Sequence, residues 1–361
     1  MAAAKTTRLT AVAMGVFIAA AAAKAVVSLI RIITTTAPDF VYYYEAAGEV
    51  TRRVSNPIHL LPPASLLIFA PLRLIPFDLA QGIWVTLSFL CLIGVVWRVT
   101  GMVGLRDPLV RWTLVALGYL SFPTQFTLGM GQINLIVLYL FVVSVAEEIR
   151  HRSVFAGGVF ALAILLKPEI GLLAPVFLLT RRWRILGSLA VFLGGVIAVS
   201  LPVFGVDAYG EYASRMNVAL GSWRDVGIYY NQGLSGLVAR MGGDSTLYFI
   251  LSVLVIVITL FIAGKRDIRF PSALWLAIPV FLLIEPIAWQ HHFVFLLPVY
   301  VLLAKRISSL KIHVWLGISF VLISMNFAAP AFLDTMPLGW LVSSHATVGT
   351  LLVWILAMAY I

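Results

Sequence analysis

The sequence predicts an all-α protein that crosses a membrane many times. Of its 361 residues, 61% are hydrophobic and only 11% are charged, and the mean hydropathy is +1.03. An average soluble domain has about 25% charged residues, so a soluble fold of this composition would expose too much apolar surface. These numbers exclude a soluble enzyme, a disordered tail and a disulfide-stapled secreted domain. The lone cysteine, Cys91, has no partner for an internal disulfide.

About twelve apolar runs can form spanning helices, which need about 20 residues, or fewer where protein surrounds them. The runs cover residues 9–30, 81–97, 112–128, 132–146, 154–166, 169–180, 185–204, 246–264, 271–288, 293–304, 312–330 and 345–361. Four prolines interrupt the stretch 60–76, which predicts an interfacial or half-buried helix, with a full span as the alternative. No repeat or linker divides the chain, so residues 1–361 are expected to form a single domain.

The net charge of +10 predicts the orientation of the chain in the membrane. With the N-terminus in the cytoplasm, six basic clusters on that side hold 16 of the 25 Lys and Arg residues, against four of the 15 acids. The clusters are Lys5/Arg8, Arg98/Arg106/Arg111, Arg150/Arg152, Arg181/Arg182/Arg184, Lys265/Arg266/Arg269 and Lys305/Arg306/Lys311. This is the positive-inside pattern, so the basic charge does not indicate nucleic-acid binding. Both termini are expected to be cytoplasmic.

The N-terminal stretch 1–30 also has features of a secretory signal, namely a basic start, an apolar run and an Ala-rich end. The run is long for a signal, and Lys24 interrupts the expected cleavage region, so we expect the segment to be retained as a span. Polar residues concentrate in the outer loops 31–60, 125–132, 205–245, 285–292 and 331–345. Because polar residues near a membrane are costly and tend to be functional, we expect the active site on the outer face.

The first outer loop begins with Asp39, directly after the first span. Pro38 fixes the turn, and a short amphipathic helix with Glu45 and Glu49 follows, so Asp39 can cap this helix. A rigid position at the end of a span also suits a general base, which must lie within hydrogen-bond reach of the proton that it takes. The spacing leaves both interpretations open.

Residues 154–180 are predicted to enter the membrane and return, because both flanks are basic. Two short arms, each about 20 Å long at 1.5 Å per residue, would meet at Lys167-Pro168-Glu169 below the outer surface. A lysine at that depth needs an anionic partner. The partner is either a structural acid such as Glu169 or the phosphate of a lipid-linked ligand.

Amides and arginines mark two further outer segments. Gln132 and Asn134 lie at the start of a helix; Asn134 can cap this helix or bond a neighbouring one, and amides can also bind sugar hydroxyls. The loop 205–245 mixes arginines, amides and aromatics, which suits a phosphorylated or glycosidic ligand and equally suits a membrane-interface belt. Within it, Arg224 and Arg240 are the better phosphate candidates because amides lie close by in the sequence.

The last cluster reads Glu285-Pro-Ile-Ala-Trp289-Gln-His291-His292. Adjacent histidines point to different helix faces and cannot form the i,i+4 pair of metal-binding helices, and a zinc site needs three or four ligands. We therefore predict no metal site. One histidine could bond a phosphate or a substrate hydroxyl, with packing at the interface as the alternative.

In order along the chain, these motifs resemble glycosyltransferase family 87. The motifs are Asp39/Phe40/Tyr43/Tyr44/Ala46/Ala47, Pro62/Pro63, Gly131/Gln132/Asn134, Lys167/Pro168, Asn231/Gln232 and Trp289/His291/His292. The resemblance implies a C-fold with short outer-face interfacial helices, in a bacterial cytoplasmic (inner) membrane. It also implies inverting transfer of a sugar, with mannose as the best guess, from a polyprenyl-phosphate donor to a glycolipid or glycan acceptor, without a cofactor. Known relatives are actinobacterial mannosyltransferases acting on phosphatidylinositol mannosides, and arabinofuranosyltransferases.

The resemblance assigns roles to the candidate residues. Asp39 would be the catalytic base, and His291 or His292 a second catalytic group. Lys167, Arg224 and Arg240 are the donor-phosphate candidates, and Tyr43, Glu45, Gln132, Asn134, Asn231, Gln232 and Trp289 the other substrate-binding candidates. The polyprenyl chain would lie between spans, among membrane lipids. The competing hypothesis is a lipid or sugar transporter or flippase, favoured by Lys24 and the Lys167 hairpin but not by any internal repeat.

Overall fold

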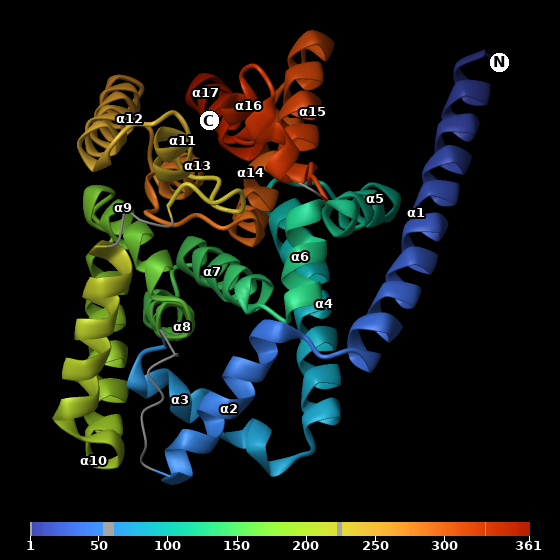
Figure 1. Ribbon diagram of the computed structural model, residues 1–361. Helices are drawn as coiled ribbons and strands as arrows, with labels where there is room; N and C mark the ends of the chain where they lie inside the picture. The colour runs from blue at the N-terminus through green and yellow to red at the C-terminus, as the bar shows by residue number, and fades with distance from the viewer. Residues whose placement is uncertain (1, 53–60, 222–225, 329) are drawn as a thin grey trace.

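The computed structural model describes residues 2–52, 61–221, 226–328 and 330–361, and within these ranges every regular element is a helix (Figure 1). The α-helices are α1 (Ala2–Thr34), α2 (Pro38–Arg52), α3 (Pro63–Phe69), α4 (Phe77–Met102), α5 (Pro108–Leu120), α6 (Phe122–Met130), α7 (Asn134–Ile149), α8 (Ser153–Leu166), α9 (Ala174–Leu179), α10 (Trp183–Gly221), α11 (Leu234–Arg240), α12 (Ser245–Lys265), α13 (Ser272–Ile284), α14 (Leu297–Arg306), α15 (Leu310–Ser324), α16 (Gly339–Val342) and α17 (His345–Tyr360). The 3-10 helices are η1 (Ala70–Leu74), η2 (Pro168–Leu173), η3 (Gln290–Leu296) and η4 (Pro330–Thr335). The predicted all-α class is confirmed.

The described helices are shorter than a count of about twelve spans requires. Four are long and apolar enough to cross a membrane, in α1, α4, α10 and α12, and a fifth span results if α6 and α7, which meet at a bend of 115°, count as one. The count of about twelve is therefore not confirmed. Most predicted runs do form helices, but prolines and polar residues break them, as at Ser121 between α5 and α6.

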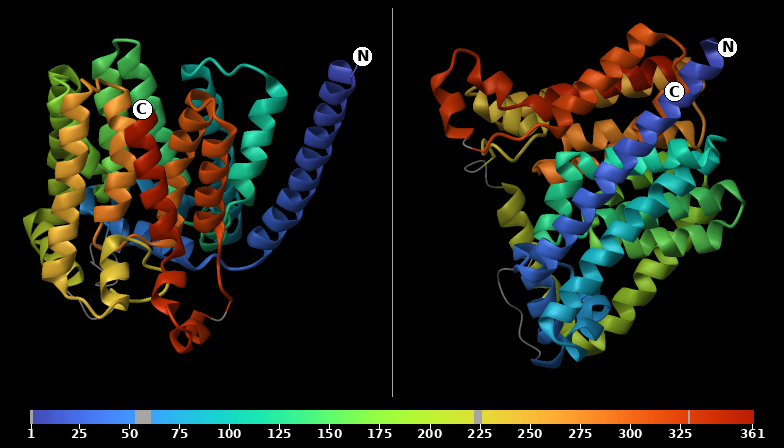
Figure 2. Two further views of the ribbon diagram at one scale, coloured as in Figure 1. Left: turned by 90° about the horizontal axis from the view of Figure 1, so that it is seen from above. Right: turned by 90° about the vertical axis from the view of Figure 1, so that its right-hand side faces the viewer.

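One large core joins most of the helices, and α1 lies at its edge. Fully buried phenylalanines from α7, α8, α9, α13 and η3 meet in this core, namely Phe141, Phe160, Phe177, Phe281 and Phe295. By contrast, α1 contacts mainly α4 and α5 and stands apart from the other helices (Figures 1 and 2). Only 11% of its apolar window is buried. Its exposed face is apolar, as expected for a helix that faces lipid.

The predicted short hairpin is present at Lys167. Its first arm, α8, has 14 residues, and η2 with α9 forms the second arm over 168–179. Lys167 itself is extended, with φ −151° and ψ 92°, because the following Pro168 disfavours a helical residue before it. Neither arm exceeds about 21 Å at 1.5 Å per residue. The stretch α3–η1 is equally short, so it cannot cross a membrane alone.

Two local expectations are wrong. Asp39 does not cap the helix that follows, because α2 begins at Pro38 and Asp39 lies within its first turn. The outer segment that begins at residue 205 is not a loop at first, because α10 continues to Gly221 beyond a kink at Gly205. That kink has φ +77°, a backbone conformation that glycine adopts without strain.

Gly131 fixes the approach of α2 to the break between α6 and α7. It closes α6 with φ +70°, and a Cβ placed there would lie 2.7 Å from the Cβ of Phe40 and 3.0 Å from the Cβ of Ala37. The indole N–H of Trp84 donates to the Gly131 carbonyl at 2.8 Å. Only glycine therefore suits this position.

We predict that Gly131→Ala lowers the free energy of unfolding by about 2 kcal/mol or more, because it adds both left-handed strain and a steric clash. Gly129→Ala is the matched control, since Gly129 lies in the same helix and nothing lies within 4 Å of an added Cβ. Thermal unfolding of both variants in detergent measures the difference. Equal unfolding temperatures would contradict the prediction.

Candidate active site

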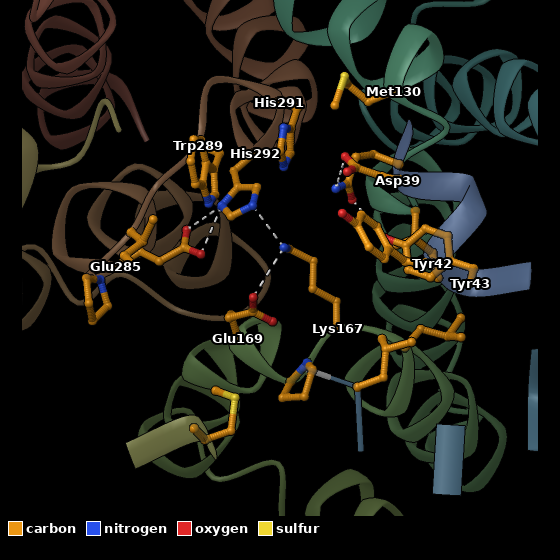
Figure 3. A pocket seen from close by; sticks show the side chains of 18 of the residues that line it. Asp39, Tyr42, Tyr43, Met130, Lys167, Glu169, Glu285, Trp289, His291 and His292 are labelled. Carbon is orange, nitrogen blue, oxygen red and sulfur yellow. Dashed lines mark hydrogen bonds and ion pairs between the residues drawn. The ribbon is translucent and has the colours of Figure 1, made fainter. Parts of the chain in front are cut away.

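The breaks between helices surround a cavity of about 460 Å³ (Figure 3). Its walls come from α2, from the α6–α7 and α8–η2 breaks, from the part of α10 beyond Gly205 and from the segment between α13 and η3. Seven predicted site residues line it, namely Asp39, Tyr43, Gln132, Lys167, Trp289, His291 and His292. Residues up to 253 positions apart in the chain thus share one site.

Asp39 lies on one wall of the cavity and is held by a short hydrogen-bond chain. The side-chain amide of Gln132 donates to Asp39 Oδ2 at 2.6 Å, and its Oε1 accepts from the hydroxyl of Tyr43 at 2.9 Å. Among the described residues, Gln132 is the only hydrogen-bond partner of Asp39 that the structure gives. Burial raises the pKa of the Asp39 carboxyl, and the hydrogen bond from Gln132 opposes this shift.

Two side chains of α4 hold both ends of this hydrogen-bond chain in place. Gln81 accepts from the backbone N–H of Ala37 at 2.8 Å and donates to the carbonyls of Ile32 and Thr35. Gln81 therefore fixes the turn between α1 and α2 that presents Asp39. About one helical turn further on, Trp84 bonds Gly131, next to Gln132. The position of the carboxylate thus depends on two buried side chains of α4, a helix that does not line the cavity.

The facing wall carries Lys167, which lies between Glu169 and His292. Glu285 lies on the far side of His292 (Figure 3). Lys167 Nζ lies 3.4 Å from Glu169 Oε1 and 3.0 Å from His292 Nε2. On the other side of its ring, His292 Nδ1 lies 2.9 Å from Oε1 and 3.0 Å from Oε2 of Glu285. Glu169, one of the two kinds of anionic partner that the sequence left open, thus lies beside Lys167, and its side chain is 39% exposed.

The two adjacent histidines have different surroundings. Both ring nitrogens of His292 have a partner, whereas His291 Nδ1 is buried and has none among the residues that the structure describes. The His291 ring lies between the two walls (Figure 3) and packs against Phe126 and Trp289. This segment lies between α13 and α14, outside the membrane-spanning helices. Burial lowers the pKa of both histidines well below the ordinary value, which favours the neutral form of both rings.

The buried amides hold the backbone of the histidine segment. Asn231 accepts from the N–H of Ala288 at 3.0 Å, and the N–H of Gln232 donates to the Ala288 carbonyl at 2.8 Å. Asn134 donates to the carbonyl of His291 at 3.1 Å. All three amide side chains are fully buried and none lines the cavity. The side chains of Asn134 and Asn231 position the histidine segment, whereas the Gln232 side chain bonds the backbone of Tyr229, Ser343 and Ala346.

Two further predicted residues, Glu45 and Arg240, do not line the cavity. Glu45 is exposed on α2, and Arg240 bonds Ser344 and the carbonyls of Ile228 and Asn231. Arg224 lies outside the described residues. Within the described part of the chain, no group of three or more His, Cys, Asp or Glu is arranged to hold a metal ion.

Sequence reasoning missed Glu285 as a site residue. Its side chain is 3% exposed, and the available signal was an acid between an apolar run and a proline. Tyr212 and Met216 also line the cavity, and they lie on the part of α10 that was expected to be a loop.

An all-helical membrane protein with a carboxylate and a paired lysine lining one cavity has the parts of a membrane-embedded transferase. The family model of glycosyltransferase family 87 matches residues 60–286, which is more than half of the chain. This chain belongs to glycosyltransferase family 87.

Curated relatives come from mycobacteria and a corynebacterium. The polyprenol-phosphate-mannose-dependent α-(1-2)-phosphatidylinositol pentamannoside mannosyltransferase of Mycolicibacterium smegmatis is 28% identical over 265 residues, covering 69% of this chain and 62% of the relative. The protein of the same name from Mycobacterium tuberculosis is 28% identical over 327 residues, covering 82% and 72%. An α-(1→3)-arabinofuranosyltransferase of Corynebacterium glutamicum is 31% identical over 193 residues, covering 52% and 44%. No solved structure gives a significant match.

We predict that Asn231→Ala lowers the free energy of unfolding by about 2–4 kcal/mol, because it leaves several buried backbone and side-chain groups unpaired. Asn217→Ala, at an exposed position of α10, is the control and is expected to have no effect. Thermal unfolding measures both variants. An unchanged unfolding temperature with a raised KM for substrate would instead indicate that Asn231 binds substrate directly.

Proposed function

We propose that this protein transfers a sugar from a polyprenyl-phosphate donor to the hydroxyl of a glycolipid or glycan acceptor, with Asp39 as the general base. Family membership and the names of the mannosyl and arabinofuranosyl relatives support this reaction class. Mannose is the proposed sugar because the two pentamannoside mannosyltransferases align over 69% and 82% of the chain, against 52% and 65% for two arabinofuranosyltransferases.

The observation that carries the proposal is the arrangement of charge across the cavity. Asp39, with a raised pKa, lies on one wall, and Lys167, held by two partners, lies on the other. A base and a cation on opposite sides of one cavity suit a reaction in which a proton leaves on one side and a phosphate leaves on the other.

The proposed reaction is a single displacement. Asp39 takes the proton of the acceptor hydroxyl as that oxygen attacks the anomeric carbon of the donor. The bond from this carbon to the phosphate oxygen breaks on the opposite face, and the phosphate keeps the electron pair, so the anomeric configuration inverts. Phosphate is already a good leaving group, so one carboxylate suffices and the paired carboxylates of retaining glycosidases are not needed.

Lys167 stabilises the leaving phosphate in this scheme. Glu169 is the partner that a phosphate can displace, because it is 3.4 Å away and 39% exposed, whereas the His292 side chain is 4% exposed. One of the two histidines completes the phosphate site, and Tyr43, Gln132 and Trp289 contact the sugars. Arg240 takes no part in this proposal, because it does not line the cavity.

The proposed setting is a bacterial inner membrane with both termini in the cytoplasm and the cavity open to the outer side. The basic clusters support this orientation. A C-fold with about twelve passes, formed by the short helices together with the four long ones, and a single domain over residues 1–361 also belong to this proposal. Donor and acceptor are the expected partners.

We predict that Asp39→Asn reduces transfer by at least about 10³-fold, because the amide cannot take the proton. Donor binding and the unfolding temperature should stay unchanged. Purified protein is supplied with a labelled polyprenyl-phosphate mannose and a panel of lipid and glycan acceptors, and products are identified by mass.

Asp78→Asn serves as the control, because Asp78 is exposed on α4 and does not line the cavity. Unchanged turnover in Asp39→Asn would contradict the base assignment. Movement of labelled lipid across vesicles without any product would instead favour the transporter or flippase.

The hydrogen bond from Gln132 predicts a shift in pH dependence. Asp39 acts only when ionised, so kcat/KM falls as the pH drops through its raised pKa. Gln132→Met removes the hydrogen bond that stabilises the carboxylate and should move this acidic limb to higher pH by about one unit. Gln125→Met, which changes an amide on α6 outside the cavity, should leave the profile unchanged. An acidic limb at lower pH in Gln132→Met would contradict the prediction.

A further inference from the structure

We infer that Glu285 and His292 form a buried positioning pair that holds the Lys167 ammonium in the cavity, so that His291 is the histidine left to contact substrate. The inference rests on the proposed function, in which Lys167 stabilises the leaving phosphate. Its structural part, the Glu285–His292–Lys167 chain, can be tested without turnover. It assigns a role to Glu285 and separates the roles of the two histidines.

The hydrogen-bond donors determine how the chain runs. A lysine ammonium has three donors and no acceptor, so at 3.0 Å from Lys167 Nζ the His292 Nε2 atom must accept. A neutral ring that accepts at Nε2 carries its proton on Nδ1. That proton points to Glu285, whose two oxygens lie 2.9 and 3.0 Å away. Glu285 thus selects the tautomer that Lys167 needs.

His292 has no free atom for a substrate. Both ring nitrogens are engaged, and its side chain is 4% exposed. His291 is the opposite case, because Nδ1 is buried without a partner among the described residues and the ring lies between the two walls (Figure 3). Nδ1 itself has no exposed surface, so Nε2 is the ring nitrogen that a hydroxyl or phosphate oxygen in the cavity can reach, since the His291 ring lines the cavity.

The backbone explains why Glu285 can select the tautomer. Glu285 is the first residue beyond α13, with φ −63° and ψ 127°, and its N–H still bonds the Phe281 carbonyl at 2.9 Å. The acid is therefore anchored to a buried helix, whereas Lys167 lies at an extended break. A flexible lysine on a break gains a defined position from a rigid acid through the ring between them.

Positioning reduces the entropy lost when a ligand binds. A free lysine side chain loses rotamer entropy when it is fixed. For Lys167 this rotamer entropy is lost during folding and not when a ligand binds. One of its three ammonium donors has no hydrogen-bond partner among the described residues. Glu169, the exposed partner, can exchange for phosphate, while His292 stays in place.

The first experiment reads the tautomer of His292. The protein labelled with ¹⁵N-histidine is studied by NMR in detergent, and His292→Gln identifies the signal by its loss. The expected result is a neutral ring protonated at Nδ1. A ring protonated at Nε2, or a charged imidazolium, would overturn the inference whether or not the protein transfers sugar.

The second experiment is a double-mutant cycle read by the KM for the polyprenyl-phosphate donor. Glu285→Leu and Lys167→Met should each raise this KM about 10-fold or more, with the KM for acceptor unchanged. The double variant should match Lys167→Met, because Glu285 acts through Lys167. Multiplied effects in the double variant would overturn the inference.

Conservative variants of His292 and Glu285 show whether the losses come from simple misfolding. His292→Gln offers an oxygen near the position of Nε2 and should restore most of the donor affinity that His292→Leu loses. Glu285→Gln can still accept from Nδ1–H and should raise the donor KM less than Glu285→Leu. Asp207→Asn, an exposed acid on α10, should leave the donor KM unchanged. Equal losses in His292→Gln and His292→Leu would contradict positioning through a hydrogen bond. If the wild type gives no product, the proposed function fails. The NMR result still decides whether the Glu285–His292–Lys167 hydrogen-bond chain exists.

Discussion

The structure depends on how polar groups are satisfied where apolar helices break. A break inside a membrane protein exposes backbone N–H and C=O groups, and these must find partners within the protein. Here, side-chain amides supply many of them: Gln81 bonds the turn before α2, and Asn231 and Asn134 bond the segment between α13 and α14. The broken ends therefore gather in one region, and their polar groups surround the cavity.

This constraint also explains why a chain with few charges can hold a charged site. A buried ammonium is costly unless it is paired, and Lys167 has Glu169 and His292 beside it. Asp39 is half-buried and has Gln132. Each charge has partners on its own wall, so the space between the walls is left for a ligand. The residues that pair with Lys167 and Asp39 are thus as important to the site as the two charged residues themselves.

Much of the candidate site could be predicted from the sequence, since Asp39, Lys167 and the histidine pair all line one cavity. They were identifiable because polar residues are scarce in an apolar chain. The amides were harder to interpret: Asn134, Asn231 and Gln232 suggested sugar binding by residue type, but they bond backbone and neighbouring groups. An amide suits a carbonyl and a sugar hydroxyl equally well, so residue type alone cannot distinguish these roles.

The sequence by itself determined the class: a helical membrane protein with basic loops and a few polar residues worth testing. It did so because hydropathy and charge are properties of short segments. Only the tertiary structure decided where helices end and which residues meet. The hydropathy of an apolar run does not show where the helix within it breaks. Glu285 and Lys167 are 118 positions apart, yet one imidazole joins them. That contact exists only because two separate breaks pack together.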